Sequence, residues 1–215
     1  MDQWLATTLS ILSGAKITLE IFLITLALSL PLGLIVALMR LSGVKPLAIL
    51  MDVYIWIMRG SPLMLQLLFV YFALPMVDIR LSDITAALLA FTMNYAAYFA
   101  EIFRAGIQSI DRGQYEAAKT LGMTYVQTMR RIIVPQMICR TLPPISNETI
   151  NLVKDTSLIY ILAMNDLLRI ARTIVQRDFD MTAFFIAGLF YLGMTAVLTA
   201  VFKRLEAHYG KYERE

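Results

Sequence analysis

Residues 182–202, TAFFIAGLFYLGMTAVLTAVF, decide the class of fold, because they contain no charged side chain. About 20 consecutive apolar residues in a helix cross the hydrocarbon core of a bilayer, so this stretch predicts a membrane span. The whole chain agrees with it: 59% of the residues are hydrophobic and 16% are charged, whereas soluble domains have about 25% charged residues. The sequence therefore predicts an all-α membrane protein.

Other apolar stretches predict four more spans. These are residues 17–39, an interrupted span at 47–58 and 63–77, residues 84–103 and residues 132–153. The interruption is Arg59-Gly60-Ser61-Pro62, and Pro143-Pro144 is expected to break or kink the fourth span. Residues 155–180 predict a short helix at the membrane interface. We expect about five spans in a single membrane domain, residues 1–215.

Basic residues in the short loops predict the orientation, since cytoplasmic loops carry an excess of Lys and Arg. Ten basic residues lie on the side that holds residues 40–46, residues 108–131 and the tail from residue 203, against five on the other side. The C-terminus is therefore expected inside and the N-terminus outside. The first residues lack a basic region and a small-residue cleavage site, so we expect no signal peptide.

Composition and motifs exclude several classes of function. One cysteine, Cys139, and one histidine, His208, cannot form an internal disulfide or a tetrahedral zinc site. The net charge of +3 is small and dispersed, which argues against nucleic acid as a partner. The sequence contains no Gly-x-x-x-x-Gly-Lys-Ser/Thr phosphate-binding loop. We expect no catalytic residue, no metal and no cofactor in this chain.

The loop of residues 108–131, between the third and fourth spans, predicts a compact knob of two helices. Residues 115–121 are rich in helix formers, and Gly122 is suited to cap the end of that helix. Thr124 and Gln127 have the spacing of a capping box at the start of a second helix. A knob on the cytoplasmic side suits docking into a groove of another protein. The alternative is a solvated helix that binds nothing.

This loop resembles the EAA loop of the permeases of binding-protein-dependent ABC importers. The family pattern is Glu-Ala-Ala, three residues, Gly, nine residues, Ile, one residue and Leu-Pro. Residues 59–62, 98–107 and 154–158 are also similar to segments of the polar amino acid permeases of the histidine, glutamine and arginine type. The matches to the loop pattern are Glu116, Ala117, Ala118, Gly122, Ile132 and Pro135, with Val134 where the family has leucine.

The resemblance implies the type I fold of importer permeases and several partners. These are a second permease, either a copy of this chain or a sister chain, and two cytoplasmic ATPase subunits that bind ATP with Mg. An extracytoplasmic amino-acid-binding protein delivers the substrate, and the chain crosses the cytoplasmic membrane several times. The residues expected to couple to the ATPase are Glu116, Ala117, Ala118, Leu121, Gly122 and Met123.

Polar side chains within the spans are the candidates for binding an amino acid, because they are costly in lipid. Glu148, Asn151 and Asp155 lie at i, i+3 and i+7 and share one helix face, with Asn94 as the expected partner across the bundle. Glu148 or Asp155 would accept from the substrate ammonium, and Asn94, Asn151 or a backbone amide would donate to its carboxylate. The acidic excess favours a cationic amino acid. The structural alternatives are a pair of Glu148 with Lys154 or Asp155, and an interhelical hydrogen bond of Asn94.

Charged residues near breaks and ends of spans have simpler expected roles. Glu101 and Arg104 are three residues apart at the inner end of the third span, which predicts a structural pair. Arg59 lies in the interrupted second span, so we expect it at the helix break or in the wall of a cavity.

The rival function is a self-sufficient ion-coupled carrier or channel. In that case Glu148 and Asp155 would bind protons or sodium ions inside the membrane. A carrier transports alone and responds to ionophores, whereas the importer requires an ATPase partner and continues while ATP lasts. The two functions therefore differ in what must be purified with the chain.

Overall fold

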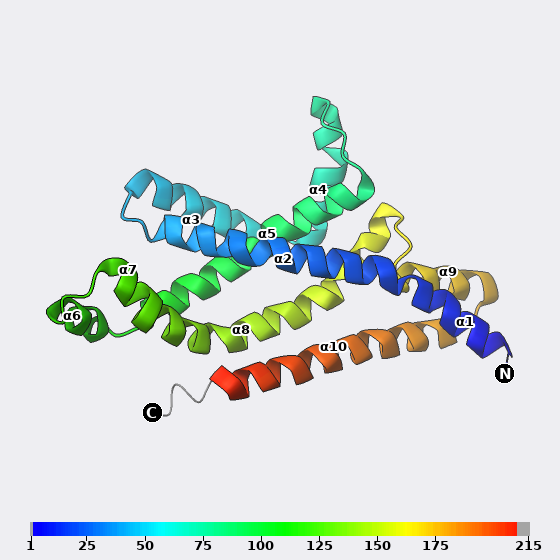
Figure 1. Cartoon of the computed structure of the whole chain (residues 1–215). Helices are drawn as coiled ribbons and strands as arrows, with labels where there is room; N and C mark the ends of the chain where they lie inside the picture. The colour runs from blue at the N-terminus through cyan, green and yellow to red at the C-terminus, as the bar shows by residue number, and fades with distance from the viewer. Residues whose placement is uncertain (1, 210–215) are drawn as a thin grey trace.

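The computed structural model describes residues 2–209, and every regular element in that range is helical (Figure 1). Short helical turns connect or continue the longer helices. The elements in chain order are α1 (Asp2–Ser13), α2 (Ala15–Arg40), α3 (Lys45–Gly60), α4 (Leu63–Phe72), η1 (Leu74–Val77), α5 (Asp83–Gln108), α6 (Arg112–Thr120), α7 (Tyr125–Thr128), η2 (Met129–Ile133), α8 (Val134–Asp155), η3 (Thr156–Leu162), α9 (Leu167–Asp178) and α10 (Thr182–Tyr209).

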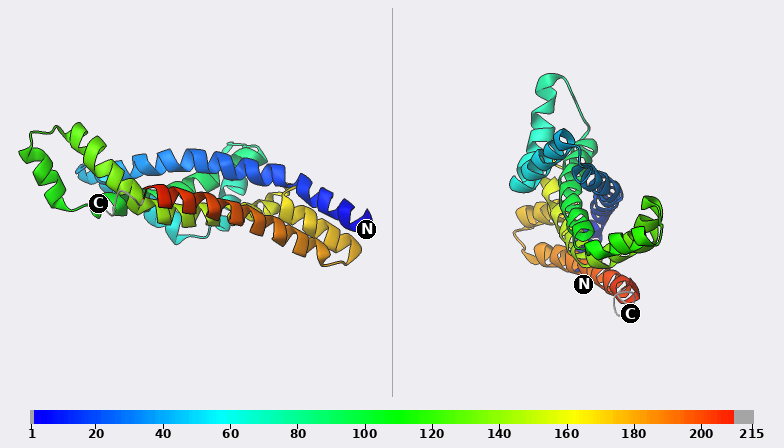
Figure 2. Two further views of the ribbon diagram at one scale, coloured as in Figure 1. Left: turned by 60° about the horizontal axis from the view of Figure 1, so that its bottom comes forward. Right: turned by 90° about the vertical axis from the view of Figure 1, so that its left-hand side faces the viewer.

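Four long helices, α2, α5, α8 and α10, give the molecule its elongated shape (Figures 1 and 2). The α6–α7 loop projects at one end of this bundle, and α1 and α9 lie at the other end. Helix α5 is central, because it packs against α2, α3, α4 and α8. Helix α10 packs against α8 and α9 on the outside of the bundle.

Small residues let α2 and α5 approach each other closely. A Cβ atom added at Gly33 would lie 2.7 Å from the Cβ of Phe99 and 2.9 Å from the carbonyl oxygen of Ala96. On the α5 side, Ala96, Ala97 and Ala100 are fully buried. Membrane helices associate through such close packing, since lipid supplies no hydrophobic force between them. Helix α5 is thereby held as a fixed support for the side chains that it carries.

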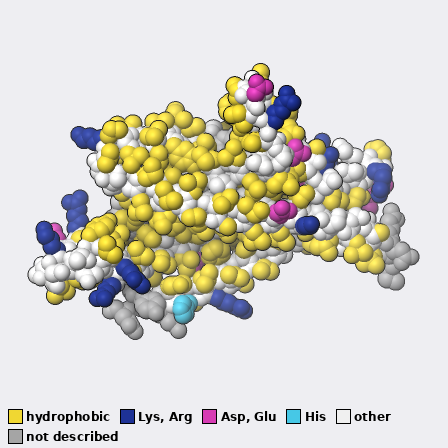
Figure 3. Space-filling model, turned by 45° about the horizontal axis from the view of Figure 1, so that its top comes forward, with side chains coloured by type: hydrophobic (Ala, Val, Ile, Leu, Met, Phe, Trp, Pro, Cys, Tyr) yellow, Lys and Arg dark blue, Asp and Glu magenta, His cyan; other side chains and the backbone are white. Residues whose placement is uncertain are grey.

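Most of the expected spans are present, with changed bounds. Residues Trp4–Arg40, Asp83–Gln108 and Thr182–Tyr209 are long and apolar enough to cross a membrane, and α3 with α4–η1 forms a fourth candidate bent by 104°. The surface fits a membrane protein, because hydrophobic side chains cover most of the face that Figure 3 shows. Helix α8 covers the remaining expected span, at about 33 Å long. It is too polar to qualify by composition, and its buried side packs against α5 and α10.

Of the break or kink expected at Pro143-Pro144, the break is absent, because α8 remains helical from Val134 to Asp155. Membrane helices tolerate proline where neighbouring groups satisfy the backbone. The irregular turn of this segment lies earlier, at the π-helical residues Met129–Ile133. Pro135 follows at the second residue of α8, where the first turn needs no donor from the backbone.

The helix expected between the last two spans is α9, and its buried apolar residues pack against α1 and α10. Leu167 and Ala171 are fully buried and belong to a small core with Ile11 of α1 and Ala183 of α10. Asp166 caps the helix, since its carboxylate accepts hydrogen bonds from the backbone N–H groups of residues 168 and 169. The expected helix is therefore confirmed, and its place at the membrane interface stays a prediction.

Charged side chains tie three helices together beside the α6–α7 end. Glu101 of α5 pairs with Arg104 on the same helix, as predicted, and also with Arg40 at the end of α2. Arg40 in turn pairs with Asp52 of α3. This network is partly exposed, which fits the end of a bundle rather than its middle. The network links α2, α3 and α5, and α5 leads directly into the projecting α6–α7 loop.

Candidate functional site

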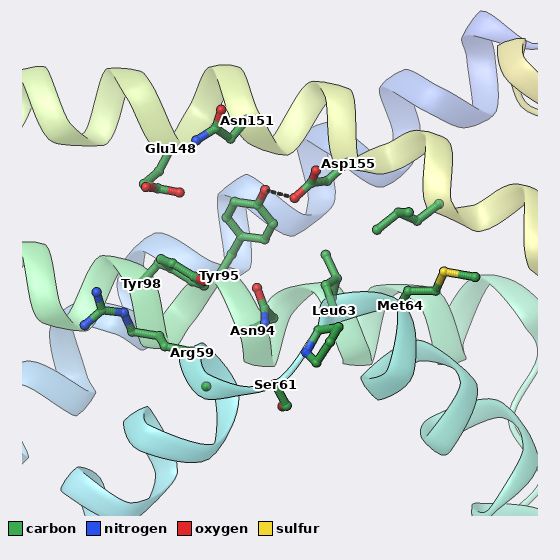
Figure 4. Close-up of a pocket in the computed structure, with 13 residues that line it drawn as sticks. Arg59, Ser61, Leu63, Met64, Asn94, Tyr95, Tyr98, Glu148, Asn151 and Asp155 are labelled. Carbon is green, nitrogen blue, oxygen red and sulfur yellow. Dashed lines mark hydrogen bonds between the residues drawn. The ribbon is translucent and has the colours of Figure 1, made fainter.

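A cavity of about 670 Å³ lies between the α3–α4 break, α5 and α8 (Figure 4). The break exposes backbone because α3 ends at Gly60 and α4 begins at Leu63. Helices α5 and α8 supply the polar side chains. The lining residues are Arg59, Gly60, Ser61, Pro62, Leu63, Met64, Asn94, Tyr95, Tyr98, Glu148, Asn151, Asp155 and Leu158.

All four residues expected to bind substrate, Asn94, Glu148, Asn151 and Asp155, line this one cavity. Glu148 and Asp155 come from α8, and their carboxylates lie on the cavity side of the helix (Figure 4). Tyr95 of α5 donates a hydrogen bond of 2.7 Å from its hydroxyl to Oδ2 of Asp155. This bond leaves the second carboxylate oxygen of Asp155 to accept from another donor.

The side-chain amide of Asn94 uses its nitrogen within the protein rather than toward the cavity. Its Nδ2 atom donates to the carbonyl of Met58 and to Oε1 of Gln66, both at 2.9 Å. The amide nitrogen is therefore occupied by interhelical hydrogen bonds, and the side-chain oxygen is the group turned to the cavity (Figure 4). The interhelical hydrogen bond expected as the structural alternative is present, and the role of Asn94 toward a ligand stays a prediction.

Gln66, which the sequence argument missed, completes a clamp around the α3–α4 break. Its Nε2 atom donates to the carbonyl of Met58 at 2.8 Å, to the Ser61 hydroxyl at 2.8 Å and to the Ser61 carbonyl at 3.1 Å. A helix end leaves carbonyl groups without partners, and these side-chain donors satisfy them. The signal in the sequence was a single amide in the apolar run of residues 63–73. We call Gln66 and Asn94 the amide clamp.

Arg59 lies in the cavity wall, which is one of the two positions expected for it. Its guanidinium stacks 5.2 Å from the centre of the Tyr98 ring, a geometry that holds a cation by attraction to the ring face. Tyr95 and Tyr98 were also missed by the sequence argument. Both sit within one helical turn of Asn94, which is the feature that could have indicated them.

The α6–α7 loop has the predicted local structure. Gly122 adopts a φ of +72°, and its N–H donates to the carbonyl of Lys119 at 3.0 Å. The next N–H, of Met123, donates to the carbonyl of Ala118 at 3.0 Å, which completes a Schellman cap. Thr124 and Gln127 form the predicted capping box at the start of α7.

The tip of this loop presents apolar side chains to the outside. Leu121 is 78% exposed, and Tyr125 and Val126 of α7 are 72% and 70% exposed. Of the expected coupling residues, Ala118 is buried and supports the knob, Met123 is half-buried, and Glu116, Ala117 and Gly122 are exposed. An exposed apolar group at a projecting end is typical of a docking surface. Tyr125 and Val126 extend the predicted set.

Comparison with known proteins assigns the family. Residues 29–211 match the family described as the binding-protein-dependent transport system inner membrane component. The chain belongs to this family. This inner membrane component works with a substrate-binding protein and with an ATPase as its partners, so the rival reading as a self-sufficient carrier is not favoured.

Several relatives of this inner membrane component span nearly its whole length. The probable amino-acid ABC transporter permease protein YckA of Bacillus subtilis is 38% identical over 94% of this chain and 90% of its own length. The arginine transport system permease protein ArtQ of the same species is 36% identical over 91% of this chain and 90% of its own length. The glutamine transport system permease protein GlnP of Escherichia coli is 37% identical over 91% of both chains.

Solved structures give the same fold. A crystal structure of an amino acid ABC transporter with histidines matches with a TM-score of 0.88 and 34% identity, over 96% of this chain and 97% of that chain. The MetNI methionine ABC transporter matches with a TM-score of 0.75 at 17% identity, over 93% of this chain and 96% of that chain, which shows the fold alone. The predicted type I permease fold is confirmed.

Proposed function

We propose that this chain is the permease subunit of an ATP-driven importer of polar amino acids, and that the cavity between the α3–α4 break, α5 and α8 is its substrate site. The observation that carries the proposal is the chemistry of the cavity wall. It combines two carboxylates on α8 with a guanidinium and a helix start on the opposite side. An α-amino acid carries the complementary pair of charges.

The carboxylate of the substrate would bind at the start of α4. The first N–H groups of a helix have no partner within it and carry partial positive charge. In α4 the backbone bonds begin with the N–H of Leu65 donating to the carbonyl of Pro62, so the N–H groups of Leu63 and Met64 remain at the cavity wall. Arg59 adds a full positive charge to the same cavity, where its guanidinium stacks on Tyr98.

The ammonium of the substrate would bind between Asp155 and the side-chain oxygen of Asn94. Asp155 keeps its orientation through the hydrogen bond from Tyr95. This leaves Glu148 about two turns away along α8, with Asn151 between them at the exposed rim. Glu148 therefore has the position to accept from a cationic side chain, which supports arginine, lysine or histidine as the preferred substrate.

A second permease would cover the open side of the cavity. Asn147, Asn151 and Lys154 are exposed on the same side of α8, and such polar groups at membrane depth face a partner or water rather than lipid. A homodimer and a pair with a sister chain both satisfy this requirement. The central path would then run between the two α8 helices.

The α6–α7 loop would dock into a cytoplasmic ATPase subunit, one for each permease. Leu121, Tyr125 and Val126 supply the apolar contact, and the Gly122 cap fixes the angle between the two helices. ATP with Mg would bind and be hydrolysed on the ATPase subunits. With the loop inside, the C-terminus is inside and the N-terminus outside, and the opposite end receives the amino-acid-binding protein.

Charge substitution at Glu148 tests the substrate assignment. In the reconstituted complex, Glu148→Gln should weaken arginine binding by about tenfold, since it removes one charge-assisted hydrogen bond, and should change glutamine binding much less. Glu20→Gln, the same substitution in α2 outside the cavity, is the matched control. Equal arginine affinity in Glu148→Gln would remove Glu148 from the site. Transport that stops with an ionophore while ATP remains would contradict the importer itself.

A further inference from the structure

Two arginines of α9 share a polar notch on the end of the molecule opposite the α6–α7 loop (Figure 1). The notch has a volume of about 440 Å³ and is lined by Tyr160, Ile161, Arg169, Arg172, Thr173 and Gln176. No acidic residue is among these lining residues. We call this site the arginine notch.

Both guanidinium groups are held around one aromatic residue. Arg172 lies 5.5 Å from the centre of the Tyr160 ring, and Nη1 of Arg169 donates to the Tyr160 carbonyl at 3.4 Å. Within residues 2–209, neither arginine forms an ion pair. Arg177 near the end of the same helix behaves differently, because it pairs with Asp178 at 2.7 Å. Among the described residues, the notch therefore holds two positive charges that form no ion pair.

The face of α9 that carries the notch is polar, which argues against a lipid as its occupant. The exposed residues of α9 are Arg172, Thr173, Gln176, Arg177 and Asp178. A helix that binds the membrane surface presents apolar side chains beside its basic ones. In α9, Leu167 and Ala171 are buried against α1 and α10, and Ile170, Ile174 and Val175 are half-buried against the same core. The exposed apolar residues nearby, Phe179 and Met181, lie beyond the far end of the helix.

The notch is also directly connected to the substrate cavity along the chain. Tyr160 and Ile161 belong to η3, which continues α8 immediately after Asp155. Leu158 of the same turn lines the substrate cavity. A ligand that bound the arginines would therefore touch a segment whose other side borders the proposed site.

We infer that the arginine notch is a docking site for carboxylate side chains of the extracytoplasmic binding protein, and that it links docking to the substrate cavity through η3. This inference rests on the proposed function. The chemistry favours carboxylate, because guanidinium groups bind it in a planar bidentate geometry. The binding protein is the partner expected at this end, opposite the loop that faces the ATPase.

Charge reversal at Arg172 tests the inference in the complete transporter. The complex is reconstituted in phosphatidylcholine vesicles, and ATP hydrolysis is titrated with the purified, amino-acid-loaded binding protein of the same importer. Arg172→Glu should raise the half-saturating concentration of binding protein by about tenfold or more, without changing hydrolysis in its absence. The difference from wild type should shrink at high salt. Arg177→Glu, the same change on the same helix, should have little effect.

Each other outcome has a defined meaning. Equal titrations for wild type and Arg172→Glu, or an equal loss in Arg177→Glu, would overturn the notch while leaving the importer intact. An effect that appears only when phosphatidylglycerol is added to the vesicles would assign the arginines to lipid and would also overturn it. A wild-type complex that its binding protein does not stimulate would refute the proposed function, and the inference with it. Restoration of Arg172→Glu by an Asp→Lys or Glu→Lys change on the binding protein would identify the paired carboxylate.

Discussion

Replacing Gln66 by leucine should weaken substrate binding by loosening the α3–α4 break. The substitution removes the two N–H donors of Nε2, which are shared among three acceptors, and the bond accepted from Asn94. The carbonyl of Met58 keeps its bond from Asn94, and the Ser61 hydroxyl still donates to the carbonyl of Ile57. Two polar groups are left without partners, namely the Ser61 carbonyl and one N–H of Asn94.

The size of the effect follows from these two groups. An unsatisfied buried polar group costs about 1–3 kcal/mol, and both groups here are only partly buried, so we take about 1 kcal/mol for each. A total of about 2 kcal/mol corresponds to a factor of about thirty in an equilibrium constant. Because the break also forms the cavity wall, part of this loss should appear as weaker binding of arginine, by about tenfold.

Equilibrium binding of labelled arginine to the purified complex measures this prediction, with thermal unfolding measured on the same samples. Gln66→Glu is the matched variant, since a carboxylate still accepts from Asn94 but cannot donate to Ser61. The double substitution with Asn94→Leu should cost less than the sum of the single ones, because the two amides act on one break. Unchanged affinity in Gln66→Leu, or strictly additive losses, would refute the amide clamp.

Three further substitutions test the packing and the loop. In SDS unfolding, Gly33→Ala should lower the free energy of unfolding by about 1–3 kcal/mol, because the new Cβ meets the fixed Cβ of Phe99. The control Gly188→Ala should be neutral, because its new Cβ meets no atom within 4 Å. Equal behaviour of the two variants would contradict the close packing. Gly122→Val should uncouple ATP hydrolysis from transport, since valine is strained at a φ of +72°. Normal coupled transport in this variant would count against docking of the loop. Glu101→Gln should lower the free energy of unfolding by about 2 kcal/mol, because Arg104 loses its anion and Arg40 keeps only Asp52. An unchanged SDS midpoint would show that the pairing is not stabilising.

Features with a local cause were accessible from the sequence. The Gly122 cap and the Thr124 capping box depend on residues that are neighbours in the chain, so their spacing predicted them. The shared face of Glu148 and Asp155 follows from the helical repeat alone. The break at residues 59–62 was visible because glycine and proline interrupt an apolar run. At Pro143-Pro144, where a break or a kink was expected, the break is absent because α8 packs as a continuous helix.

Contacts between distant residues required the tertiary structure. The hydrogen bond between Asn94 and Gln66 joins residues 28 positions apart, and the pair of Arg40 with Glu101 joins residues 61 positions apart. A one-dimensional pattern cannot predict which end of an amide is used, so the hydrogen bonds of the Asn94 amide nitrogen became visible only in the structure. The arginine notch likewise exists only because η3 folds back beside α9.

The sequence by itself determined that this is an all-helical membrane protein with a two-helix loop of the importer permeases. It did so because membrane insertion depends on apolar length and helix caps depend on adjacent residues. Only the tertiary structure decided the 104° bend between α3 and α4, the occupied amide of Asn94 and the single cavity that unites α8 with Arg59. These features depend on how helices far apart in the chain pack, and close packing of small residues such as Gly33 selects that arrangement.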